Sequence, residues 1–240
     1  MHTVVVVGTC HEETKHYSTK ALVEIIEAIR PSLILEELPE DWVVDNKWRK
    51  TTPGGGLEDT ALIKYSTKHP ECRIIPYDIK GRNDVLYKHE HKKNWKLFFT
   101  AIENLRKENK LSVEDLLLYK QTMDAYTLRD KGFYSDYPRV INSASCDYLM
   151  MYKNKVTMRY YKKIIEEYEE LKPYKAHILF DERFWKVRTN AMDENILKIL
   201  RNEKKNVRAL VLCGFEHRND LIPKLKKHQD EIVVKEYWEL

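Results

Sequence analysis

The sequence predicts an α/β protein built on a mostly parallel β-sheet with flanking helices and a large helical insertion. Short runs rich in β-branched residues recur along the chain, and segments with helical spacing of apolar residues separate them. With 240 residues and 42% hydrophobic side chains, the chain is long enough to bury one sizeable core. We therefore expect a single α/β domain over residues 1–240.

The predicted strands lie in two groups, near the two ends of the sequence. The segments are 3–8 (TVVVVG), 32–38 (SLILEEL), 72–79 (CRIIPYDI), 207–214 (VRALVLCG) and 231–238 (EIVVKEYW). Between the first two, residues 17–32 place Leu22, Ile26 and Ile29 at helical spacing, and Pro31 ends the helix before the next strand. This strand–helix–strand pattern predicts one parallel βαβ unit.

Two further segments are expected to be helical. Residues 219–231 should cross over between the last two strands, with Pro223 in the first turn of the helix. Residues 82–205 contain no predicted strand and consist of aromatic-rich amphipathic patterns, which predicts a mainly helical insertion. The insertion is either a lid over the site or a block that covers the sheet and buries its own Tyr and Leu faces.

Composition excludes several classes of partner. The net charge is +4, and no block of like charges marks a nucleic-acid-binding arm. No apolar stretch approaches the roughly 20 residues of a membrane helix, so we expect a cytoplasmic protein without a membrane partner. The four cysteines lack CxxC spacing and are expected to be reduced thiols: Cys10, Cys72, Cys146 and Cys213.

Two turns near the ends of the sequence share a glycine followed three residues later by a histidine. Gly8 and His11 follow the first predicted strand, and Gly214 and His217 follow the fourth. Ligands of parallel sheets bind beyond the carboxyl ends of the strands. We expect each glycine to let the chain turn sharply and each turn to start a helix whose amides favour anions. If these strands are neighbours, about 5 Å apart, the two imidazoles face one pocket.

Acidic side chains lie at the corresponding ends of the other strands. The second strand carries Glu36 and Glu37, one of which must point away from the pocket because side chains alternate, and the third carries Asp78. Other acids flank the histidines: Glu12, Glu13 and Glu216. Such a set suits manganese, iron or zinc, or a general acid/base pair. Alternatively, Asp78 only caps or turns the chain before Gly81.

Several other patterns are weaker candidates. The HEETKH segment at 11–16 places its second histidine five residues after the first, where a metalloprotease helix needs four. The PGGGLED segment at 53–59 lacks the GK[ST] of a phosphate-binding loop and is predicted to be a surface loop, and HEH at 89–91 to be a solvated helix start. A thiol nucleophile at Cys10 or Cys213 is a further option, although small cysteines at strand ends are usually buried.

Four motifs together resemble a known family. They are Gly8-Thr9-Cys10-His11, Glu37-Leu38 after Pro31, RTNAMDENI from Arg188, and Gly214-Phe215-Glu216-His217 followed by LIPKL. In this order they resemble the TraB/Tiki/ChaN-like superfamily, which includes erythromycin-esterase-like proteins. The resemblance covers the two ends of the chain and not its helical middle.

The resemblance implies a hydrolase site. His11 and His217 would be its central residues, Glu37 a ligand or acid/base, and Arg188 a contact for an anion or transition state. Relatives are thought to include metal-dependent proteases and esterases that open a macrolide ring, and another is linked to haem-iron uptake.

Helical geometry places Arg183 and Asn190 on one face and Arg188 on another, so only one arginine can enter the pocket. The family pattern favours Arg188.

The leading hypothesis is a hydrolase that acts on a small molecule or peptide, with His11, Glu37 and His217 around a divalent metal or one activated water. Candidate substrate contacts are Glu12, Glu36, Asp78, Asn190 and Glu216. The alternatives are a non-catalytic protein that binds a small molecule or haem, and a scaffold whose tyrosine-rich helices form a homodimer.

Overall fold

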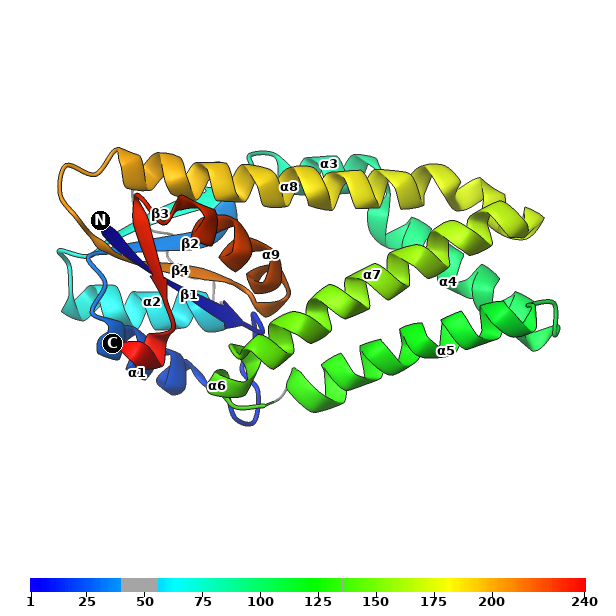
Figure 1. Cartoon of the computed structure of the whole chain (residues 1–240), viewed down its shortest axis with the longest axis horizontal. Helices are drawn as coiled ribbons and strands as arrows, with labels where there is room; N and C mark the ends of the chain where they lie inside the picture. The colour runs from blue at the N-terminus through cyan, green and yellow to red at the C-terminus, as the bar shows by residue number, and fades with distance from the viewer. Residues whose placement is uncertain (40–55, 135) are drawn as a thin grey trace.

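A computed structural model describes residues 1–39, 56–134 and 136–240. Its sheet has five parallel strands in the order β3-β2-β4-β1-β5, which confirms the predicted α/β fold class. The strands are β1 (His2–Thr9), β2 (Leu33–Pro39), β3 (Arg73–Asp78), β4 (Arg208–Gly214) and β5 (Ile232–Lys235). Figure 1 shows them side by side at one end of an elongated molecule.

The first and fourth strands are neighbours, as the shared pocket requires. Gly8 of β1 pairs with Cys213 of β4, and Thr9 pairs with Gly214. The two glycine turns therefore leave the sheet side by side, at its carboxyl edge.

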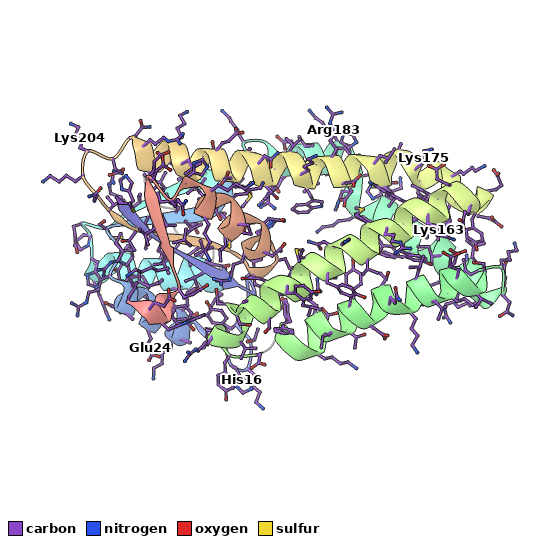
Figure 2. All side chains as sticks on the ribbon, viewed as in Figure 1. His16, Glu24, Lys163, Lys175, Arg183 and Lys204 are labelled. Carbon is purple, nitrogen blue, oxygen red and sulfur yellow. The ribbon has the colours of Figure 1, made fainter. Side chains whose placement is uncertain are left out.

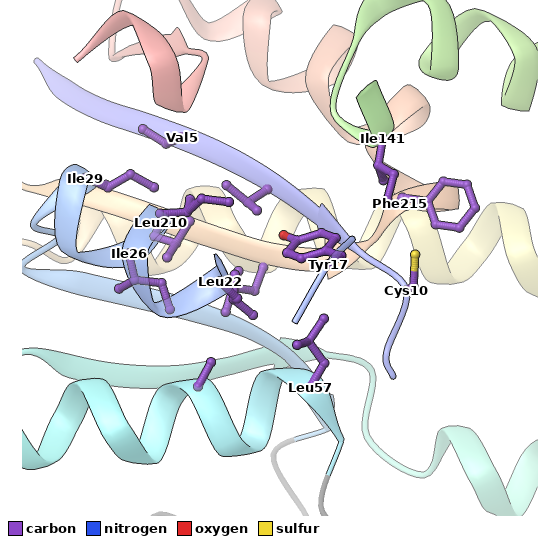
Figure 3. Close-up of a cluster of buried hydrophobic side chains, with 14 of the residues drawn as sticks. Val5, Cys10, Tyr17, Leu22, Ile26, Ile29, Leu57, Ile141, Leu210 and Phe215 are labelled. Atoms are coloured by element: carbon purple, nitrogen blue, oxygen red, sulfur yellow. The ribbon is translucent and has the colours of Figure 1, made fainter. Parts of the chain in front are cut away.

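Helices cover both faces of the sheet. On one face, α1 (Thr19–Ile29) and α2 (Leu57–Lys68) bury a cluster that includes Leu22, Ile26 and Leu210 (Figure 3). On the other, α8 (Lys175–Arg201) and α9 (Phe215–Leu225) pack Met192 and Leu221 against alternate strand residues. Because helices cover both faces, the central strands β1 and β4 are buried along almost their whole length.

The expectation for Pro223 is wrong. Helix α9 begins at Phe215, directly after β4, so that Pro223 lies close to the end of the helix rather than in its first turn. The strand leads into the helix without a loop, which moves the start of the helix four residues ahead of the expected segment. Pro223 removes one backbone donor near the helix end, where a 3₁₀ turn (Lys226–His228) follows.

The insertion is helical, as predicted. Its elements are α3 (Arg82–Lys88), α4 (His91–Lys107), α5 (Val113–Leu128), a π-helical turn (Arg129–Phe133), α6 (Pro138–Ile141), α7 (Ala144–Glu167), a 3₁₀ turn (Glu169–Tyr174) and most of α8. Helices α4 and α5, the second half of α7 and the first half of α8 form what we term the helical arm, which projects away from the sheet (Figure 1).

The arm has a hydrophobic core of its own, separate from the two clusters at the sheet. It includes Phe98, Tyr160, Ile164 and Ile178. The arm thus buries its own aromatic and aliphatic faces. The second half of α8 continues beyond the arm and packs over the sheet. No helix within the described ranges is both long and apolar enough to cross a membrane.

Candidate functional site

A cavity of about 560 Å³ lies where the carboxyl ends of β1 and β4 meet the base of the helical arm. The strand ends and the start of α9 contribute Thr9, Cys10, His11, Gly214, Phe215, Glu216, His217 and Asp220. Helices α4, α5, α7 and α8 contribute, among others, His91, Trp95, Tyr126, Lys153, Tyr161, Asp181 and Trp185. His11 and His217, predicted to face one pocket, both line this cavity.

The two turns interlock through their glycines. A Cβ atom on Gly8 would lie 2.8 Å from the Cα of Phe215, and one on Gly214 would lie 2.6 Å from Nε2 of His11. Each glycine therefore makes room for residues of the other turn, because carbon atoms cannot approach so closely without displacement. The repeated motif follows from this reciprocal contact.

The expected role of the glycines as sharp-turn residues is wrong. Neither Gly8 nor Gly214 has a positive φ, and Gly214 has an ordinary φ of −57°. The left-handed residue in the first turn is His11 itself, with φ of 61°. Only the second turn leads directly into a helix, since α1 starts at Thr19.

His11 is oriented by a residue that the sequence patterns did not single out. Its Nδ1 lies 2.8 Å from Oε1 of Glu58, the second residue of α2, and Thr9 Oγ1 also donates to that oxygen. The backbone supports the contact, because Leu57 N donates to His11 O at 3.2 Å and a Cβ atom on Gly56 would lie 2.8 Å from that oxygen.

Part of the PGGGLED segment therefore belongs to the site. Residues 53–55 lie outside the described ranges, whereas residues 56–59 approach His11 and start α2. A glycine run followed by Glu and Asp is a helix-start pattern, and it could have drawn attention to Glu58. Its distance of 47 residues from His11 concealed the pairing.

The environment of His11 favours its protonated form more than water does. Partial burial lowers the pKa of His11, but the hydrogen bond and charge of Glu58 and the charge of Glu37 outweigh it and raise the pKa above 6.5. The side chain is 61% exposed, so a ligand in the cavity can reach the ring. The Glu58 carboxylate accepts the Nδ1 proton, which leaves Nε2 as the second ring nitrogen of the neutral form.

His217 lies in front of a buried arginine. Arg188 is 2% exposed, does not line the cavity, and donates Nη1–H to Nε2 of His217 at 2.9 Å. An arginine can only donate, so Nε2 must accept and the single proton of His217 lies on Nδ1. Burial lowers the pKa of His217, more than the charge of Glu37 raises it, and the ring is held neutral.

Two carboxylates hold Arg188. Glu37 accepts from Arg188 Nη2, and Asp78 accepts from Nε at 2.9 Å and from Nη2 at 2.7 Å. Asp78 also accepts from Arg82 at 2.6 Å and from the N–H of Ile79 at 2.7 Å, so it both turns the chain and holds the arginine. The guanidinium therefore orients His217 and is not placed to contact a substrate, which corrects the expected role of Arg188 as an anion contact.

Glu37, rather than Glu36, points toward the site. Its Oε2 accepts from the N–H of Gly214 at 2.7 Å, and its Oε1 lies 3.5 Å from Nε2 of His217. Burial alone would raise the pKa of Glu37, but its interactions with His217, with the Arg188 guanidinium and with the N–H of Gly214 lower it to about 2. Neither Glu37 nor the adjacent, buried Glu36 lines the cavity, so Glu37 acts on the site through its contacts with His217, Arg188 and Gly214.

These contacts leave little room for the metal site considered above. Glu37 and His217 would be ligands together with His11, yet Nε2 of His217 and Oε1 of Glu37 already accept from Arg188, and Oε2 accepts from Gly214. Within the described part of the chain, no group of three or more His, Cys, Asp or Glu side chains is placed to hold a metal ion. The donor set therefore fits a hydrogen-bonded cluster better than a metal.

Of the remaining predicted residues, Glu216 lines the cavity, whereas Glu12 and Asn190 do not. Glu216 lines the cavity between Arg129, whose Nη1 lies 2.6 Å away, and Lys153. Glu12 accepts from Tyr134 at 2.6 Å in the loop after β1. Asn190 is exposed, accepts from Lys224 at 2.6 Å and does not reach the cavity.

Two alternatives receive no support. Burial raises the pKa of Cys10 to about 12, which disfavours the thiolate that a nucleophile needs, and burial also raises the pKa of the fully enclosed Cys213 well above its usual value. Arg183 is exposed on the outer side of α8 (Figure 2), away from the cavity.

Comparisons of this chain with family models, curated proteins and solved structures gave no match.

Proposed function

We propose that this protein is a hydrolase in which His11 acts as a general base on a water molecule in the cavity. The observation that supports the proposal is the His11–Glu58 pair, which orients an exposed imidazole at the cavity wall beside a second, neutral histidine. A carboxylate that holds one imidazole nitrogen and leaves the other for proton transfer is the arrangement that general-base catalysis uses.

Glu58 serves as a positioning residue in this proposal. It accepts the Nδ1 proton of His11, fixes the tautomer, and stabilises the imidazolium that forms when Nε2 takes a proton from water. Gly214 lets the Nε2 edge of the His11 ring lie against the start of α9, three residues before His217.

His217 serves as the donor to the substrate oxygen. Its Nε2 is held by Arg188, so its Nδ1–H is the only N–H that the ring can offer to a developing oxyanion. Arg188, Glu37 and Asp78 act through His217: they hold its orientation and its tautomer from behind.

The proposed substrate is a small molecule or a short peptide. A cavity of about 560 Å³ is within the range that holds such ligands, and its wall carries several aromatic rings together with a few polar groups. The same polar contacts at Glu37 and His217 favour the metal-free version of the mechanism. A cytoplasmic location remains part of the proposal, in keeping with four free, buried cysteines.

The test is hydrolysis of a panel of chromogenic esters, lactones and peptides. His11→Ala should lower kcat/KM on any substrate found by about 10²- to 10⁴-fold, the usual contribution of a general base. His16→Ala is the matched control, since His16 lies in the same loop and does not line the cavity. Full activity of His11→Ala on a confirmed substrate would exclude the proposed base.

A pH profile separates the base from a merely structural residue. Activity should rise with pH as His11 loses its proton, with an apparent pKa above 6.5. Glu58→Gln removes the charge that raises the pKa and should move this limb to lower pH as well as reduce the rate. A ligand that binds intact, with no product after long incubation, would instead favour the non-catalytic binding protein.

A further inference from the structure

Asp181 is a buried acid at the arm side of the cavity. It lies on α8, is 5% exposed, and contributes to the cavity wall beside Trp95 and Trp185. The proposed reaction does not use it.

All hydrogen bonds to Asp181 reach one of its two carboxylate oxygens. Oδ1 accepts from His91 Nε2 at 2.6 Å, from Trp185 Nε1 at 3.1 Å and from Trp95 Nε1 at 3.4 Å. None of the described residues donates to Oδ2. A buried carboxylate normally has both oxygens satisfied, so Oδ2 retains capacity for a donor from a ligand.

Asp181 has no lysine or arginine partner in the described part of the chain. Among the described lysines and arginines none forms an ion pair with it, and its only ionisable partner is His91, which is charged only when protonated. Burial and the nearby His91 lower the pKa of the adjacent His177, which disfavours its charged form. A buried charge without a cationic partner is costly, which favours a cation that comes with the ligand.

A second acid in the same cavity provides an internal comparison. Glu216 is held by both Arg129 and Lys153, so its charge is fully matched within the protein. Asp181 has indole N–H groups in the corresponding places. Indoles carry no charge, and their rings attract cations at close range; the Arg188 guanidinium already lies 5.0 Å from the centroid of the Trp185 ring.

We propose that Asp181, Trp95 and Trp185 form a binding site for a positively charged group of the ligand, an alkylammonium or a guanidinium. The cation donates to Oδ2 of Asp181 and contacts the indole rings. Binding itself does not depend on hydrolysis. The corollary that substrates carry a cationic group on the side distant from the scissile bond rests on the proposed function.

The test compares benzylammonium with benzyl alcohol, its neutral analogue of similar shape, by isothermal titration and tryptophan fluorescence. Wild-type protein should bind the ammonium at least about tenfold more tightly. Asp181→Asn, which keeps an oxygen acceptor for the N–H donors, should abolish the preference. Glu182→Gln is the matched control, because Glu182 also lines the cavity on α8 but is paired with Lys162 at 2.5 Å.

Several outcomes overturn the site. They are equal binding of alcohol and ammonium by wild type, no binding of either, and an unchanged preference in Asp181→Asn. Should Asp181→Asn fail to fold, Trp185→Leu decides: it should weaken the ammonium more than the alcohol, and an equal effect on both excludes the site. Selective binding of the amine by a protein that hydrolyses no substrate would refute the proposed function and leave this site standing, while hydrolysis without charge preference would do the reverse.

Discussion

At the scale of single residues, Gly8 and Gly214 matter through the Cβ atoms that they lack, because each leaves space for a residue of the other turn. The pattern identifies both glycines, both histidines and Asp78, and the family resemblance selects Glu37 over Glu36. The pattern assigns the glycines to backbone freedom, whereas the structure uses their missing Cβ atoms. That reason depends on the pairing of Gly8 with Cys213 and of Thr9 with Gly214, which a single sequence does not reveal.

Alanine at the two glycines should have different effects. At Gly8 the new Cβ meets backbone of Phe215 at 2.8 Å, so Gly8→Ala should lower the free energy of unfolding by about 1–3 kcal/mol. At Gly214 it meets the end of the His11 side chain, which can move. Gly214→Ala should therefore lower the free energy of unfolding by less. It should also move the His11 ring away from Glu58, so that the pKa of His11 falls. Urea unfolding measures the stability of the two variants, and NMR titration measures the pKa of His11. Equal losses of stability in the two variants would contradict the different contacts assigned to the two glycines.

The low pKa of Glu37 makes stability depend on acid. The carboxyl has a pKa of about 2 in the folded protein against 4.5 for the ordinary group, so its contribution is present above about pH 5 and is lost as pH falls toward 2. The shift corresponds to roughly 3 kcal/mol. Glu37→Gln should flatten the acid limb of the unfolding free energy. Glu24→Gln, at an exposed glutamate of α1, should leave the limb as in wild type.

At the scale of elements, the strands and the helical insertion could be predicted, but their mutual contacts could not. Glu58 reached His11 only through the placement of α2, and Asp181 met Trp95 only through the packing of α4 beside α8. Arg218 of α9 is another residue whose contacts depend on how distant elements pack. It donates to Val6 O at 2.7 Å, to Glu236 at 2.8 Å and to Asp147 at 3.2 Å, and so joins α9 to β1, the chain end and α7.

Removal of this buried guanidinium should destabilise the protein strongly. Arg218→Met leaves two carboxylates without their cation, and we expect a loss of about 3–5 kcal/mol. Arg201→Met serves as the control, since Arg201 pairs with Glu231 at the surface and exposed pairs contribute about 1 kcal/mol or less. Chemical denaturation compares them. Similar losses from the two variants would show that Arg218 does not hold the elements together.

At the scale of the whole molecule, the described residues form two cores at the sheet and one in the arm. The insertion was predicted as helical, yet its projection away from the sheet was not, because amphipathic periodicity gives which face is buried and not what buries it. The cavity lies at the junction, so its far wall could not be foreseen from the strand-end motifs.

Because the arm has a hydrophobic core of its own, we expect it to unfold locally without the sheet. Ile164→Ala removes a fully buried side chain from the arm core and should cost about 2–5 kcal/mol locally. Hydrogen exchange should then accelerate in α5 and the second half of α7, while β1 and β4 keep their protection. Ile26→Ala, in the cluster beneath α1, should affect the strands instead. Equal acceleration of arm and strands by Ile164→Ala would indicate a single cooperative unit.

The interlocked glycine turns also bear on how such a protein can diverge. Gly8 and Phe215, like Gly214 and His11, occupy space that only one member of each pair can fill. A side chain at position 214 therefore requires a smaller residue at position 11, whereas a side chain at position 8 meets backbone that no substitution at position 215 removes. The two turns thus couple positions some 200 residues apart in the sequence.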